Sequence, residues 1–252
     1  MANPVLTEQR FELTSSLPTT ATGVVTMTKA GVLSATGVLF VFLLAGATAG
    51  WWKFSSLLSP SAGVMTRGTT TTLVIAGITA FVVGLVAVFM PKLAKILGPI
   101  YAICEGFLIG AISKAYDARF HGIVVMALGA TLAVALTVYA LYATGTIKVT
   151  NRLRSTIIAA TLGLLVLYVV LALISAFGGT NFISTGGPLA IGFTIITAGL
   201  AASNLLLDFD FIDRAIASGA NRNYEWYSAL GIVMTLVWLY LELLRLLSYF
   251  RD

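Results

Sequence analysis

Four ionisable residues lie inside long apolar stretches of this 252-residue chain: Glu105, Asp208, Glu242 and Arg245. On membrane-insertion scales an Asp, Lys or Arg at a helix centre costs about 2.5–3.5 kcal/mol, so such residues are candidates for function. Burial and a neighbouring carboxyl group both disfavour the charged form of a carboxylic acid. The same oxygens suit calcium, a hard cation that prefers several oxygen ligands. Protons and calcium would therefore compete for a site built from such acids.

Further acids extend this candidate site. Asp208, Asp210 and Asp213 lie in the segment LDFDFID, and Glu225 stands at the start of the last apolar stretch. Side chains two residues apart point to different faces of a helix, so at most one or two of these acids can meet a shared ligand. We expect Asp213 to be solvated at the helix end, whereas Asp210 either lies there as well or belongs to the site; Arg214 could pair with either of them.

Helical spacing places the isolated charges on continuous faces. A small and polar face contains Thr194, Thr197, Ala201, Asn204 and Asp208. A second face contains Ser228, Gly231, Thr235, Trp238, Glu242, Arg245 and Tyr249. A third consists of Ala102, Gly106, Gly110 and Ser113, with Glu105 at its edge. We expect the polar faces to turn toward other helices or a wet cavity, and the glycines to allow close helix packing. The three-residue spacing of Glu242 and Arg245 allows an ion pair within one helix, which is either structural or functional.

The composition indicates an integral membrane protein. Hydrophobic residues make up 58% of the chain and charged residues only 10%, with a mean hydropathy of +0.97, whereas a soluble domain has about 25% charged residues. The net charge of +5 comes from basic residues scattered through short loops, which favours topology signals and anionic lipid headgroups over nucleic acid. The sequence contains no HExxH zinc motif, GxSxG elbow or glycine-rich phosphate loop, so we expect no enzyme activity and no cofactor apart from calcium as a permeant or bound ion.

Seven apolar segments approach the roughly 20 residues that a membrane crossing needs. The sequence therefore predicts an all-α bundle of seven transmembrane helices in residues 31–252, preceded by a polar, disordered cytoplasmic tail over residues 1–30. The predicted spans are about 31–52, 71–90, 97–115, 121–143, 155–177, 187–209 and 226–249.

The distribution of basic residues predicts the orientation. Nine Lys and Arg residues lie in the tail and the even-numbered loops, against five on the opposite side. This bias places the amino terminus in the cytoplasm and the carboxyl terminus outside. Glu105, Asp208, Asp210 and Glu225 then share the cytoplasmic half of the membrane. Glu242 lies about 25 Å further along its helix than Glu225, in the other half.

Three segments together carry a resemblance to a known family. They are CEGFLIG at 104–110, LDFDFI at 207–212 with the following Gly219 and Asn223–Tyr224, and SALGIVMTLVWLYLELLRLL at 228–247. In this order and spacing they resemble the transmembrane Bax inhibitor motif family, most closely a bacterial subgroup. The resemblance implies a seven-helix fold with the last helix at its centre, in the bacterial inner (plasma) membrane. It also implies a pH-sensitive calcium leak, gated by an acidic pair from the sixth and seventh helices.

The resemblance assigns candidate roles residue by residue. Asp208 matches the acid of the sixth helix, but an ungapped comparison puts Thr235 where the family has its seventh-helix Asp. Glu242 would match that acid only after a shift of seven residues. Glu105 matches the third-helix Glu-Gly of many members and is the expected partner of Asp208. The predicted proton-sensing or ion-binding residues are Asp208, Glu105, Asp210 and Glu225. Of these, Asp208 and Glu105 are the expected calcium ligands. The secondary candidates are Glu242, Arg245, Thr235 and Asn204.

Two functions remain open at this point. The first is a pH-sensitive calcium (cation) leak channel, gated by protonation of carboxylates inside the membrane. The alternative is a non-conducting regulator that binds another membrane protein, such as a membrane protease. The expected partners are the lipid membrane, calcium ions and protons, with a membrane protein in the second case and no nucleic acid in either.

Overall fold

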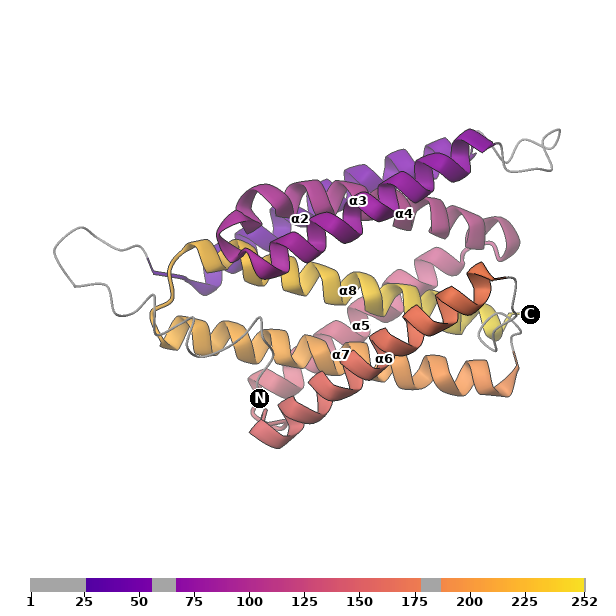
Figure 1. Ribbon diagram of the computed structural model, residues 1–252. Helices are drawn as coiled ribbons and strands as arrows, with labels where there is room; N and C mark the ends of the chain where they lie inside the picture. Colours follow the sequence, from indigo (N-terminus) through magenta and orange to yellow (C-terminus); the bar gives the residue numbers. More distant parts are fainter. Residues whose placement is uncertain (1–25, 56–66, 178–186, 252) are drawn as a thin grey trace. The chain divides into compact units, whose positions relative to one another are not determined.

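The computed structural model describes residues 26–55, 67–177 and 187–251 of the chain. Within these residues the regular structure is helical, apart from an isolated bridge between Thr26 and Asn221. The all-α prediction is thereby confirmed. The elements are α2 (Lys29–Ser55), α3 (Arg67–Phe89), the short 3₁₀ helix η1 (Pro91–Leu93), α4 (Ala94–Arg119), α5 (Ile123–Ala143), α6 (Asn151–Ala176), α7 (Pro188–Ala217) and α8 (Asn223–Tyr249) (Figure 1).

Six of these helices are long and apolar enough to cross a membrane: α2, α4 together with η1, α5, α6, α7 and α8. The described part of α3 adds a shorter apolar stretch, Ile75–Phe89. An apolar helix satisfies its backbone hydrogen bonds internally, as the hydrocarbon core of a membrane requires. The chain is accordingly a multi-pass membrane protein.

Helix α7 extends further than its sequence predicts. The prediction ends the sixth span at residue 209, but α7 continues to Ala217. Gly219 stops it with a positive φ of 70°, a conformation that glycine adopts without a steric penalty. Asp210 and Asp213 therefore lie within the helix rather than at its end. Of the two alternatives for Asp210, the structure does not support the solvated helix end, because the carboxylate is paired with Arg154.

The chain forms two compact units. Unit 1 comprises Met1–Arg119 and Phe211–Met234, and unit 2 comprises Phe120–Asp210 and Thr235–Asp252. Helices α7 and α8 thus contribute one part to each unit. In unit 1, α4 packs against both α2 and α3 (Figure 1).

Glycines bring α2 and α4 into backbone contact. A Cβ atom at any of four glycines would overlap a backbone carbonyl oxygen of the facing helix. These glycines are Gly46 and Gly50 of α2, and Gly106 and Gly110 of α4. Small residues four positions apart allow this close approach. The predicted packing role of Gly106 and Gly110 is confirmed.

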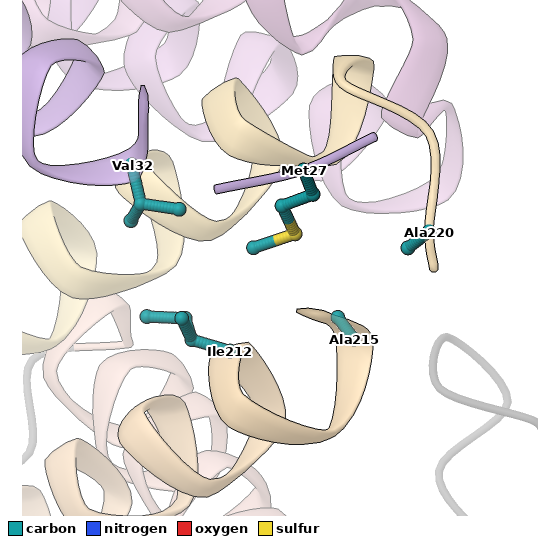
Figure 2. Packing of buried hydrophobic residues seen from close by; sticks show 5 residues of the cluster. All are labelled: Met27, Val32, Ile212, Ala215 and Ala220. Atoms are coloured by element: carbon teal, nitrogen blue, oxygen red, sulfur yellow. The ribbon is translucent and has the colours of Figure 1, made fainter. Parts of the chain in front are cut away.

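A buried apolar cluster holds the segment before α2 in unit 1. Met27, Val32, Ile212, Ala215 and Ala220 form this cluster, and Figure 2 shows Met27 and Val32 facing α7. The Met27 side chain is 2% exposed, and its backbone N–H donates a hydrogen bond to the Ala220 carbonyl at 2.8 Å. Of the tail predicted over residues 1–30, the structure describes 26–30. Of these, Met27 is buried against the turn between α7 and α8, and Thr26 forms the isolated bridge with Asn221.

Unit 2 is built from α5, α6 and the unit 2 parts of α7 and α8. Ala198 and Ala201 of α7 pack against Leu239 of α8, with Val134 of α5 alongside. Phe209 of α7 makes an edge-to-face contact with Tyr139 of α5, with ring centroids 5.3 Å apart. These contacts pack α7 against both α5 and α8 within this unit, and so position the acids that this part of α7 carries.

Candidate functional site

Asp208 of α7 contacts Thr235 of α8 within unit 2. The Thr235 hydroxyl donates a hydrogen bond to Asp208 Oδ2 at 2.6 Å, and Thr235 is 9% exposed. In the part of the chain that the structure describes, no lysine, arginine or histidine forms an ion pair with Asp208. A single neutral hydroxyl is thus the described polar partner of this acid.

This contact supports the ungapped comparison made from the sequence. That comparison put Thr235 where the resemblance implies a seventh-helix acid, and named Glu105 as the expected partner of Asp208. The structure brings Thr235 and Asp208 together, with the threonine hydroxyl as the donor. A threonine hydroxyl donates to an ionised carboxylate and also accepts from a protonated one. The contact can therefore persist in both states of Asp208.

The other two acids of the LDFDFID segment have cationic partners. Arg154 of α6 contacts Asp210 Oδ2 at 2.7 Å in unit 2. Lys29 of α2 contacts Asp213 Oδ1 at 2.7 Å in unit 1. These two cationic contacts come from different helices, and both differ from the Thr235 contact of Asp208. Arg154 was not among the predicted site residues, because nothing in the sequence indicates which helix faces Asp210.

Glu242 accepts four hydrogen bonds in unit 2. Its Oε1 accepts from the Tyr168 hydroxyl at 2.7 Å and from the Trp238 indole at 3.2 Å. Its Oε2 accepts from the Thr197 hydroxyl at 2.9 Å and from the Arg245 guanidinium at 3.2 Å. The residue is 3% exposed. The predicted ion pair between Glu242 and Arg245 is confirmed, and it belongs to a network that includes α6 and α7.

The polar face of α7 contacts neighbouring helices in the same unit. Asn204 donates a hydrogen bond to the Thr161 hydroxyl of α6 at 2.8 Å, and Thr197 reaches Glu242 of α8. Thr194 is 0% exposed, and its hydroxyl has no hydrogen-bond partner among the described residues. The prediction that this face points inward is therefore confirmed for Asn204, Thr197 and Asp208.

Glu225 lies in unit 1, at the start of α8. It is 4% exposed. Its Oε1 accepts hydrogen bonds from the Thr28 backbone N–H at 3.0 Å and from the Thr28 hydroxyl at 3.1 Å. The Arg222 guanidinium lies 3.4 Å from Oε2. These contacts hold the start of α2 beside the start of α8, which gives Glu225 a structural role in this unit.

Glu105 also lies in unit 1, on α4. Its side chain is half-buried beside the glycines that contact α2, and it makes no hydrogen bond or ion pair with another described residue. Asp208 belongs to unit 2. The pairing of Glu105 with Asp208 therefore stays a prediction.

The acids of the apolar helices fall into two groups. Arginines neutralise Asp210 and Glu242, whereas Asp208 and Glu105 have no cationic partner among the described residues. The described residues contain no group of three His, Cys, Asp or Glu that could hold a metal ion. Asp208 and Thr235 together supply fewer oxygens than the six to eight that calcium prefers. These two residues alone therefore do not form a complete calcium site.

The chain was also compared with known proteins. A family model described as Bax inhibitor 1 like matches residues 3–252. No curated protein and no solved structure matches the chain. The family match agrees with the resemblance carried by the segments around Glu105, Asp208 and Thr235.

Proposed function

Because the chain belongs to the Bax inhibitor 1 like family of membrane proteins, we propose that it is a pH-sensitive calcium leak channel with Asp208 as its sensor. One observation carries this proposal. Asp208 lies in an apolar helix, and its described polar contact is one hydroxyl at 2.6 Å. An isolated charge is costly in such surroundings. Asp208 is therefore suited to gain and lose a proton or to attract a passing cation.

The proposed mechanism rests on competition for the carboxylate oxygens. Ionised Asp208 accepts the Thr235 hydrogen bond and keeps one oxygen free of described partners. A hard cation binds the oxygen of an ionised carboxylate in preference to that of a protonated carboxyl group. Protonation removes the charge that attracts calcium. Calcium flux is therefore expected to fall as the pH falls through the titration of Asp208.

The proposed topology has seven spans, with the amino terminus in the cytoplasm of a bacterial cell and α8 at the centre of the bundle. The length of α3, 23 residues, supports its role as the seventh span. Burial around α8 supports its central place, because Leu239, Tyr240, Glu242 and Leu244 are all buried although they point in different directions. A helix that is buried on all sides belongs in the interior of a bundle.

Glu105 is proposed as a second protonatable group of the channel. Two carboxyl groups within about 4–6 Å of each other can share a proton or a cation. If Glu105 and Asp208 form such a pair, Glu105→Gln and Asp208→Asn are expected to have non-additive effects on calcium flux. Simple additivity of the two substitutions would show that the acids act independently.

Calcium flux through the purified full-length protein in liposomes tests the proposal. Vesicles containing a calcium-sensitive dye are expected to fill faster than protein-free vesicles, and the rate is expected to vary between about pH 5 and pH 8. Vesicles that carry folded protein but show no flux at any pH would overturn the channel proposal. That result would favour the non-conducting regulator, which acts by binding another membrane protein such as a protease.

A further inference from the structure

Thr235 and Glu242 lie on one face of α8, two helical turns apart. Seven residues separate them, which corresponds to about 10 Å along the helix. Both contact α7 in unit 2: Thr235 through Asp208, and Glu242 through Thr197. Between these polar contacts, Leu239 packs against small residues of α7.

The two polar contacts differ in the number of hydrogen bonds. Asp208 receives one described hydrogen bond, whereas Glu242 receives four. An ionised carboxylate has about four acceptor sites, so the donors around Glu242 saturate it. Two of these donors, Tyr168 of α6 and Thr197 of α7, come from other helices. Glu242 therefore joins three helices at one point.

The apolar contact between these two sites does not specify position strongly. Ala198 and Ala201 pack against Leu239, and the hydrophobic contribution of such a contact is non-directional. A shift of α8 by one turn would move it about 5.4 Å, far more than a hydrogen bond tolerates. The directed bonds to Glu242 prevent such a shift within this unit.

We propose that Glu242 is a positioning residue, which fixes the register of α8 against α6 and α7 and thereby holds Thr235 on Asp208. The effect of Glu242 on ion flux rests on the proposed function, but its effect on the register of α8 does not. The described hydrogen bonds of Glu242 do not include Asp208. Glu242 acts through the placement of Thr235.

Disulfide cross-linking measures the register directly. Ala201→Cys and Leu239→Cys place two thiols at the packed contact between α7 and α8, in a Cys104→Ala background that removes the single native cysteine. Glu242→Leu alone would leave Arg245 as an uncompensated charge and could prevent folding. The decisive variant is therefore Glu242→Leu with Arg245→Leu, because an apolar pair often replaces an ion pair without loss of stability.

A second variant isolates the hydrogen bonds from the ion pair. Glu242→Gln with Arg245→Leu keeps a side chain that can bond Tyr168 and Thr197 but carries no charge. The apolar double variant is expected to cross-link several-fold more slowly, because α8 spends less time in the register that brings the two thiols together. The Gln variant is expected to restore most of the rate. Lys114→Leu with Asp117→Leu removes an ion pair of the same spacing from α4 and serves as the matched control.

The outcomes separate this inference from the channel proposal. Equal cross-linking rates in the folded apolar and Gln variants would overturn the positioning role, whatever the flux. If the wild-type protein conducts calcium, the apolar variant is also expected to lose the wild-type pH profile, and the Gln variant to recover it. A channel-inactive wild type with the expected cross-linking pattern would overturn the proposed function and leave the positioning role supported.

Discussion

Gly106→Ala should separate α2 from α4 and destabilise unit 1. A Cβ atom at Gly106 would overlap the backbone carbonyl oxygen of Leu43 on α2. The obstacle is backbone, so rotation of a side chain cannot relieve the overlap. The two helices must move apart, which also weakens the neighbouring contact of Gly110 with Ala47.

The size of the effect follows from comparison with an open glycine. Overpacking a well-packed contact by a methylene costs about 1–3 kcal/mol. Replacing glycine with alanine in a helix gains up to about 1 kcal/mol in intrinsic propensity. Gly129 of α5 is the matched control, because a Cβ atom there would meet nothing within 4 Å. The propensity gain is common to both substitutions, so Gly106→Ala should be less stable than Gly129→Ala by about 1–3 kcal/mol.

Unfolding of the purified variants in detergent, followed by circular dichroism, measures this difference. Gly129→Ala is expected to match or exceed the wild-type midpoint, and Gly106→Ala to unfold earlier. Gly163→Ala on α6 is a second control, since its Cβ atom would also meet nothing within 4 Å. Equal stability of Gly106→Ala and Gly129→Ala would refute the backbone contact between α2 and α4.

Three further predictions concern the sensor, the start of α2 and the topology. Thr235→Asp should make the calcium flux respond more steeply to pH, because two adjacent carboxyl groups cannot both ionise freely; an unchanged pH profile in liposomes would argue against the Asp208 contact. Glu225→Leu should speed hydrogen exchange at the Thr28 amide, whose described acceptor it removes, and unchanged exchange would contradict that contact. A reporter that works only outside the cytoplasm should be active when it is fused after Asp252. Activity of a reporter that works only in the cytoplasm, fused at the same position, would overturn the proposed orientation.

The sequence predicts helices and their polar faces well in this chain, because periodicity depends on residues close together along the chain. The inward face of α7 and the ion pair between Glu242 and Arg245 both follow from spacings of three or four residues. The sequence named Glu105 as the expected partner of Asp208, whereas the described contact of Asp208 is with Thr235.

The partners from distant segments could not be predicted from the same information. Periodicity tells which face of a helix is polar but not which helix will cover it. Tyr168 lies 74 residues from Glu242, and Thr28 lies 197 residues from Glu225. The end of α7 was misplaced for the same reason. Asp210 looks like a helix-ending residue until Arg154, 56 residues away, is known to neutralise it.

The pH profile of calcium flux in Asp208→Asn liposomes tests the central claim most directly. Asparagine keeps the shape of the side chain but carries no charge, so the variant should lose most of the pH dependence between about pH 5 and pH 8. Asp213→Asn removes a charge from the same helix at a more exposed ion pair, whose contribution to stability is small, and it should keep the wild-type profile. A flux in Asp208→Asn that still varies with pH as in the wild type would contradict the assignment of Asp208 as the sensor.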